Sequence, residues 1–181
     1  MAATDDATIT LTQAGSAGIT LPVSVLGFGS GYYNASCTVD YSELDSFSKN
    51  SACWINTTDF LATDTYHVIE NSGSSVLNIT ADTDKFNAEN LFCSGVTCPG
   101  TTSAEIAIQS QQNETGSCNT ALTTPYEKIL DDTKEYPTGL CDELNFQDSK
   151  DTIRVYYRFR VPIDAHAGAK TLTVTYEGIA V

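Results

Sequence analysis

The stretch Ile153-Arg-Val-Tyr-Tyr-Arg-Phe-Arg-Val161 decides the fold class of this chain. Its odd-numbered residues are all apolar or aromatic, whereas its even-numbered residues are three arginines and one tyrosine. Alternation with a period of two is typical of a β-strand that buries one face and exposes the other. Near the end of the sequence, Leu172, Val174 and Tyr176 alternate with threonines in the same way. These two segments are therefore predicted to be strands.

Further strands are predicted upstream. The segments with the same alternation are residues 7–12, 19–25, 76–81 and 104–109. Pro22 indicates that its strand lies at a sheet edge, because proline has no N–H to donate to a neighbouring strand. Residues 66–69 and 76–81 flank the turn sequence Asn71-Ser-Gly-Ser74, which predicts a hairpin. Within residues 76–81, the alternation places Asn78 on the solvent face.

The remaining sequence contains few helical signals. Only a weak pattern near residues 126–130 is helical. Residues 111–150 are interpreted as a long excursion of the chain, a connecting segment that Cys118 and Cys141 hold in place. Many short alternating strands with few helices indicate an all-β fold, which we predict to be an antiparallel immunoglobulin-like β-sandwich with disulfide-pinned loops. We expect one sandwich domain over residues 19–181, preceded over residues 1–18 by a separate strand and a hinge.

An even number of cysteines favours disulfides and an oxidising, extracellular environment. The six cysteines are Cys37, Cys53, Cys93, Cys98, Cys118 and Cys141. We adopt the sequential pairing 37–53, 93–98 and 118–141, because it closes short loops. A metal site is the alternative: the Cys93-x4-Cys98 spacing fits two zinc ligands, but no second close pair and no nearby histidine completes it.

The charge balance excludes several classes of partner. The chain has 9 Lys+Arg against 23 Asp+Glu, which gives a formal net charge of -14. Nucleic acids and anionic membranes both require a basic face, so neither is expected as a partner. The 25 threonines and 16 serines make the expected surface rich in hydroxyl groups.

No motif for catalysis or for a cofactor is present, and we expect no enzymatic activity and no cofactor. Structural calcium is a weaker possibility, because some loop acids could supply oxygen ligands. Those acids are Asp40, Glu43, Asp45, Asp82, Asp84, Asp131 and Asp132. None follows the EF-hand spacing, and solvated surface acids are the simpler interpretation.

Four Asn-x-Ser/Thr sequons predict covalent N-linked glycans, as expected of a secreted surface protein. They begin at Asn34, Asn56, Asn78 and Asn113. The alternative is that these are unmodified surface asparagines.

All three arginines of the chain, Arg154, Arg158 and Arg160, lie on one face of one predicted strand. They could pair with acids on neighbouring strands of the same chain. They could instead form a docking stripe for an acidic partner, such as another copy of the chain. The residues leave both interpretations open.

The N-terminal segment gives the strongest indication of function. The strand at residues 7–12 presents Ala7, Ile9 and Leu11 on one face, and a small-residue hinge follows at residues 14–18. This strand could fold back as a hairpin, or it could add to the sheet edge of a neighbouring copy. A head-to-tail addition does not close, so it generates a filament.

The residue 7–12 strand, the 14–18 hinge, the four sequons and the closing strand at residues 170–176 together resemble a known class of protein. These are the small, secreted, threonine-rich, glycosylated β-sandwich subunits of archaeal threads and related surface filaments. The resemblance implies a structural subunit at the cell surface that assembles head to tail by donor-strand complementation, without membrane insertion. The alternative is a monomeric carbohydrate-binding or adhesive surface module, with Tyr32, Tyr33 and Trp54 as candidates for stacking on sugars.

Overall fold

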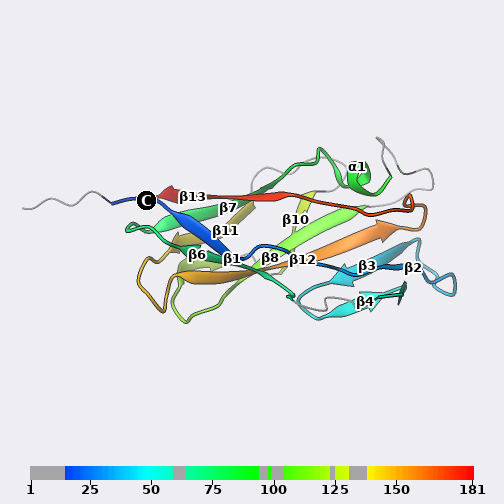
Figure 1. The fold of residues 1–181 in the computed structure, drawn as a ribbon, viewed down its shortest axis with the longest axis horizontal. Coiled ribbons are helices and arrows are strands. Elements are labelled where there is room, and N and C mark those ends of the chain that lie inside the picture. The colour runs from blue at the N-terminus through cyan, green and yellow to red at the C-terminus, as the bar shows by residue number, and fades with distance from the viewer. Residues whose placement is uncertain (1–14, 59–63, 94–97, 99–103, 123–124, 131–137) are drawn as a thin grey trace, which may run out of the picture.

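The computed structural model describes residues 15–58, 64–93, 98, 104–122, 125–130 and 138–181 (Figure 1). The fold is all-β, with a seven-stranded sheet, a four-stranded sheet and a small two-stranded sheet. Every strand pair among the described residues is antiparallel. The predicted strand at residues 7–12 lies outside the described residues.

The seven-stranded sheet is organised around its longest strand, β12. Its members are β1 (Ile19–Val23), β3 (Tyr41–Asp45), β4 (Asn50–Ala52), β6 (His67–Asn71), β8 (Glu105–Gln112), β10 (Glu127–Leu130) and β12 (Thr152–Pro162). Along one edge β12 pairs first with β6 and then with β3, and along its other edge it pairs with β8. β1 is an edge strand outside β6, as Pro22 predicts.

The four-stranded sheet forms a second layer. Its order is β13 (Val174–Ala180), β7 (Leu77–Thr83), β11 (Thr138–Leu144) and β9 (Cys118–Leu122). The small sheet pairs β2 (Gly31–Tyr33) with β5 (Trp54–Asn56). The single described helix, α1 (Ala88–Phe92), begins at Asn87, whose side-chain oxygen accepts a hydrogen bond from the Asn90 N–H.

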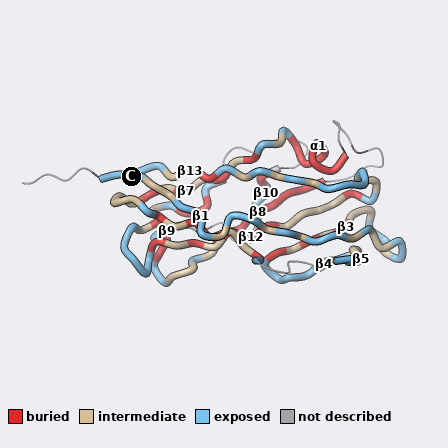
Figure 2. Tube along the Cα trace, viewed as in Figure 1, coloured by how far each residue is buried: buried red, intermediate tan, exposed pale blue. Residues whose placement is uncertain are grey.

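One hydrophobic core lies between the two larger sheets, where buried positions of both layers face each other (Figure 2). The four-stranded sheet contributes Leu77, Ile79 and Leu140, and the seven-stranded sheet contributes Ile106 and Ile153 among others. β7 alternates strictly between buried and half-buried residues, and Asn78 falls on the half-buried outer face as predicted.

Three local predictions are wrong. Residues 66–69 and 76–81 do not form a hairpin: β6 belongs to the seven-stranded sheet and β7 to the four-stranded sheet, so the turn between them crosses from one layer to the other. The segment near residues 126–130 is strand β10 and not a helix. Its pairing with β8 overrides the weak local helical preference. The long excursion at residues 111–150 likewise contains three strands, β9, β10 and β11.

The six cysteines pair as Cys37–Cys53, Cys93–Cys98 and Cys118–Cys141. This is the sequential pairing predicted from the sequence. Cys118–Cys141 joins the adjacent strands β9 and β11, and Cys93–Cys98 lies at the end of α1. Disulfides persist in oxidising compartments, so the three pairs suggest an environment of extracellular type. No helix in the described part of the chain is long and apolar enough to cross a membrane.

Candidate functional site: an open groove between the two layers

The core is incomplete along the second half of β12. Ile153, Val155 and Tyr157 are buried, whereas Phe159 and Val161, on the same face, are only partly buried. Over the second half of β12, the rings of Phe28 and Phe92 lie 4.7 Å and 6.4 Å from the ring of Phe159 and leave it partly exposed. An apolar sheet face that its second layer covers only in part stays in contact with water.

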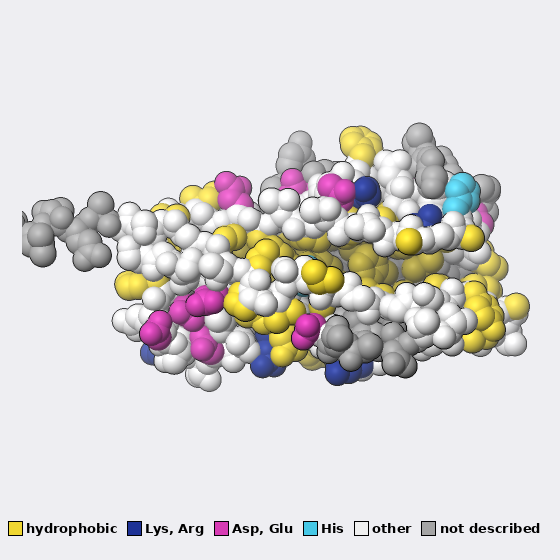
Figure 3. Space-filling model, in the orientation of Figure 1, with side chains coloured by type: hydrophobic (Ala, Val, Ile, Leu, Met, Phe, Trp, Pro, Cys, Tyr) yellow, Lys and Arg dark blue, Asp and Glu magenta, His cyan; other side chains and the backbone are white. Residues whose placement is uncertain are grey.

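A groove of about 1170 Å³ lies over this partly covered half. One wall is formed by residues 165–174, which lead into β13, and the other by residues 24–33, which connect β1 with β2. Figure 3 shows hydrophobic side chains at the bottom of the hollow between the two layers. The groove floor includes Leu44, His67, Leu91, Phe92, Tyr157 and Phe159.

Several side chains that line the groove are apolar and remain partly exposed. Leu26, Phe28, Leu172 and Val174 pack against the edge of the core but are not fully buried. Val25 is 75% exposed. Leu172 and Val174 line the groove and pack against the core, and the exposed Thr171 and Thr173 line the groove beside them. The groove therefore presents hydrophobic walls that the described chain leaves unfilled.

Three aromatic residues singled out from the sequence gather at one end of this groove. Tyr32 and Tyr33 of β2 and Trp54 of β5 all line it. Tyr32 is 55% exposed, whereas Trp54 is half-buried next to the Cys37–Cys53 disulfide. The Tyr33 hydroxyl donates hydrogen bonds to the carbonyl oxygens of Cys37 and Val39, so this side chain is held in place.

A polar cluster of His67, Tyr157 and Tyr176 lies at the floor of the groove. The hydroxyl oxygens of Tyr176 and Tyr157 lie 2.7 Å and 3.1 Å from Nδ1 of His67, and the two hydroxyls hydrogen-bond each other. Burial lowers the pKa of His67 from 6.5 to about 4. Burial also raises the pKa of both tyrosines above the ordinary value of 10.0. All three groups are therefore neutral near pH 7.

The edge of the four-stranded sheet beside the groove is open. Among the described strands, β13 pairs only with β7. An unpaired strand edge presents a row of backbone N–H and C=O groups that can pair with another strand. An apolar groove next to such an edge can accept a further strand, with backbone bonds on one side and apolar side chains beneath it.

The predicted arginine stripe lies on the opposite, outer face of β12. Glu105 on β8 is almost fully buried, with a side-chain exposure of 3%, and accepts bonds from Arg158 Nη2 at 3.0 Å and Arg160 Nη1 at 3.2 Å. Lys128 Nζ lies 3.4 Å from the same carboxylate. Arg160 Nε also lies 3.3 Å from Glu43 of β3. Arg158 and Arg160 thus pair with acids on neighbouring strands of their own chain.

Each arginine of the stripe also packs on a tyrosine ring. The guanidinium carbons of Arg154, Arg158 and Arg160 lie 4.7, 4.9 and 5.2 Å from the ring centroids of Tyr66, Tyr126 and Tyr41. Arg154 Nε further donates to Asn113 Oδ1 over 2.6 Å. The structure therefore shows the intrachain contacts that one of the two interpretations predicts. A contact of these arginines with another subunit stays a prediction.

The four sequons lie at the surface but in different surroundings. Asn56 is exposed, and Asn34, Asn78 and Asn113 are half-buried. The Asn78 side-chain oxygen accepts from the Glu143 N–H over 3.0 Å. Asn113 donates through Nδ2 to Thr152 Oγ1 over 2.9 Å. Glycosylation of these residues stays a prediction.

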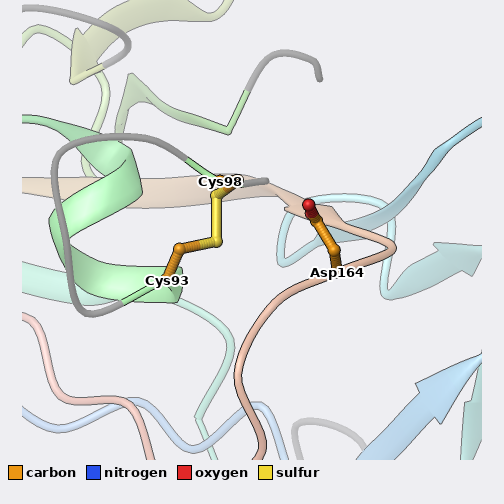
Figure 4. A group of neighbouring side chains, drawn as sticks. All are labelled: Cys93, Cys98 and Asp164. Atoms are coloured by element: carbon orange, nitrogen blue, oxygen red, sulfur yellow. A yellow bond between two sulfur atoms is a disulfide. The ribbon is translucent and has the colours of Figure 1, made fainter. Parts of the chain in front are cut away.

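Those acids considered for calcium that the structure describes are engaged with protein groups. Asp45 accepts from the Tyr126 hydroxyl and Asp84 from Lys85, each over 2.7 Å, and Asp131 and Asp132 lie outside the described residues. Among the described residues, the only group of three metal-ligand types is Cys93, Cys98 and Asp164 (Figure 4). The two cysteines are bonded to each other, so their sulfurs are not thiolate ligands.

The groove walls were not identified from the sequence. The wall at residues 24–33 contains Gly27, Gly29 and Gly31, which interrupt the alternation that marks β1. The wall at residues 165–174 begins with the small residues Ala165, Ala167, Gly168 and Ala169. Two such irregular stretches directly beside strong strands are the signal that could have indicated an unfinished edge.

No protein-family model matches this chain, and neither a curated protein nor a solved structure matches it.

Removal of the buried Glu105 charge should destabilise the fold. Glu105→Gln leaves Arg158 and Arg160 without their shared carboxylate, and the expected loss is about 3 kcal/mol, as for breaking a buried ion pair. Glu43→Gln is the matched control, because Glu43 is 30% exposed. It should cost less than about 1 kcal/mol. Urea unfolding measures both values, and equal losses for the two variants would contradict this role of Glu105.

The buried neutral His67 should make stability fall on acidification. Because its pKa is about 4 in the folded protein and 6.5 otherwise, the unfolded chain binds more protons between these values. Stability from this residue is present above pH 6.5 and is lost as the pH falls toward 4, by at most about 3 kcal/mol.

His67→Gln isolates this effect, since an amide can still hydrogen-bond the tyrosine hydroxyls. Between pH 7 and pH 4 the wild type should lose up to about 3 kcal/mol more unfolding free energy than the variant. His166→Gln, at the exposed second histidine, is the control. Parallel stability curves for the wild type and His67→Gln would show that His67 is not the cause.

Proposed function

We propose that this chain is an extracellular structural subunit of a glycosylated surface filament, in which the N-terminal strand of each subunit completes the fold of its neighbour. The observation that carries the proposal is the apolar groove beside the open edge of β13. An unfilled groove of this size in a small all-β protein favours a missing strand as its occupant.

The N-terminal segment has the sequence that such a groove requires. Ile9 and Leu11 alternate with threonines, so one face of the extended segment is apolar. Their burial would contribute roughly 1.5–3 kcal/mol for each side chain. Each backbone hydrogen bond to the open edge would add roughly 0.5–1.5 kcal/mol. These gains must exceed the cost of ordering the segment.

The position of the chain ends favours insertion into a neighbour. The first described residues lie beside the C-terminus, at one end of the long axis (Figure 1). Ser16 N–H donates to Ser74 Oγ and Val181 N–H donates to the Val76 carbonyl, so the start of the described residues and the C-terminus are both bonded to the segment between β6 and β7. The groove extends toward the opposite end of the molecule, where β2 lies (Figure 1). A head-to-tail contact of this kind continues from copy to copy.

The surface chemistry supports an extracellular location. The three disulfides are suited to an oxidising compartment, and the side chains of all four sequon asparagines are at least partly exposed. We further propose that the two larger sheets form an immunoglobulin-like sandwich, which the inserted strand extends on the β13 side.

A carbohydrate-binding surface module is the second candidate. It is favoured by Tyr32, Tyr33 and Trp54, which all line the groove. Aromatic rings with a polar tip suit the stacking and hydrogen bonding of sugars. On this alternative, the groove would take a glycan in place of a strand.

Deletion of residues 1–14 separates the two candidates. A filament subunit without these residues should fail to form fibres in negative-stain electron micrographs and should have a lower melting temperature than the assembled protein. Val174→Asp should also abolish fibres in the full-length chain, because it places a charge on the groove wall. Circular dichroism of the monomeric variants establishes whether they remain folded.

Ile179→Asp is the matched control, since Ile179 is 54% exposed on β13 and does not line the groove. It should leave fibre formation intact. Discrete particles from the full-length protein, together with binding of an oligosaccharide that survives the deletion, would replace the filament proposal by the binding module.

A further inference from the structure

We infer that residues 7–13 of a second copy add to the free edge of β13 in antiparallel orientation, with Ile9 opposite Val174 and Leu11 opposite Leu172. This inference rests on the proposed function and specifies its partner strand, its direction and its register. It follows from three observations: which residues of β13 turn their backbone groups toward the open edge, where the groove narrows, and where the first described residues and the C-terminus lie.

The bonds between β13 and β7 show whether the odd-numbered or the even-numbered residues of β13 turn their backbone groups toward β7. Asp84 N–H donates to the Thr173 carbonyl over 3.0 Å, and Val181 N–H donates to the Val76 carbonyl over 3.1 Å. Because bonded pairs alternate along an antiparallel ladder, the odd-numbered residues of this segment turn their backbone groups toward β7. The even-numbered residues, Leu172 and Val174 among them, turn theirs toward the open edge.

The same even-numbered residues present their side chains to the groove. Leu172, Val174 and Tyr176 pack on the core, while Thr171, Thr173 and Thr175 are exposed. Residues directly opposite each other in a sheet point to the same face. The apolar residues of the added strand must therefore lie opposite even-numbered residues, and its threonines opposite threonines.

One register matches apolar residues with apolar residues. With Ile9 opposite Val174, Leu11 lies opposite Leu172 and Gln13 opposite Lys170. A shift by two residues in one direction places Leu11 opposite the charged Lys170. A shift in the other direction places Ile9 opposite Tyr176. The side chain of Tyr176 is only 8% exposed and already fills this position.

The groove also narrows where this register places a small residue. Ile19 of β1 approaches β13 so closely that a Cβ added at Gly178 would lie 3.0 Å from Ile19 Cγ2. The groove lining on this wall accordingly ends at Val174. In the chosen register Ala7 lies opposite Tyr176, next to this closed end, and the strand needs no further room.

The direction distinguishes a neighbour's strand from the chain's own. In Figure 1, β13 runs toward the end of the long axis where the C-terminus and the first described residues lie, whereas β2, whose Tyr32 and Tyr33 line the groove, lies at the other end. A neighbour's strand that enters at the β2 end, with its residue 14 outermost, runs antiparallel to β13. The chain's own N-terminal segment would enter from the end closed by Ile19 and run parallel to β13.

Cysteine cross-linking on the solvent face tests this arrangement in the full-length chain. In the inferred register Thr10 lies opposite Thr173 and Thr12 opposite Thr171, and both are non-hydrogen-bonded pairs with Cα atoms about 4.5 Å apart. This separation suits a disulfide, and the substitutions leave the apolar face unchanged.

Chains with Thr10→Cys are mixed with chains carrying Thr173→Cys, and Thr12→Cys with Thr171→Cys, under mild oxidation. Both mixtures should give disulfide-linked dimers on non-reducing gels. The control mixture of Thr10→Cys with Thr175→Cys should give about tenfold fewer, because diagonal partners are roughly 7–8 Å apart. Each single variant alone sets the background.

The outcomes separate the inference from the proposed function. Fibres with dimers from the two predicted mixtures support both. Fibres with dimers from Thr12→Cys and Thr175→Cys instead show parallel addition and overturn the inference, while the filament function stands. A Thr12→Cys, Thr175→Cys double variant that links within one chain, without fibres, shows self-insertion and overturns both. Absence of fibres and of every intermolecular link also overturns both.

Discussion

The need to cover the apolar face of β12 governs this structure. Ile153, Val155 and Tyr157 lie under the four-stranded sheet and are buried, whereas Phe159 and Val161 extend beyond it and are only partly covered. Among the described residues, Phe28 of the irregular stretch 24–33 and Phe92 of the short helix α1 pack on Phe159, and residues 165–174 form one wall of the groove, so this cover is only partial. This incomplete cover leaves the β13 edge unpaired and the apolar groove unfilled. One additional strand would pair with the edge and fill the groove.

The arrangement of charge limits how copies of this protein can attach. Two copies that each have a net charge of -14 repel each other, and Arg158 and Arg160 do not relieve this repulsion between copies when they pair with Glu43 and Glu105 of their own chain. A contact between copies must therefore depend on apolar burial and backbone hydrogen bonds, which salt affects little. The groove provides both, with His67 neutral at its floor.

The sequence predicted those parts of the fold that local alternation determines. It identified β12, the strand character of the closing segment, the edge position of β1 and the outward direction of Asn78. It did not predict that β6 and β7 lie in different sheets, because a Gly-Ser turn serves a hairpin and a crossing between layers equally well. It mistook β10 for a helix, since four residues carry too little periodicity. The sequence did not predict the groove, because the groove is formed by segments far apart in the sequence. Of the residues that line it, only the aromatic residues Tyr32, Tyr33 and Trp54 were singled out.

Hydrogen exchange at the β13 edge tests the central claim most directly. The amides of Leu172 and Val174 point toward the open edge, whereas the Thr173 amide donates to Asp84 within the same chain and serves as an internal reference. If a neighbour's strand completes the fold, exchange at Leu172 and Val174 should slow markedly in the full-length protein relative to the chain lacking residues 1–14, with Thr173 slow in both. Equally fast exchange at Leu172 and Val174 in the two proteins would show that nothing pairs with this edge and would contradict the account.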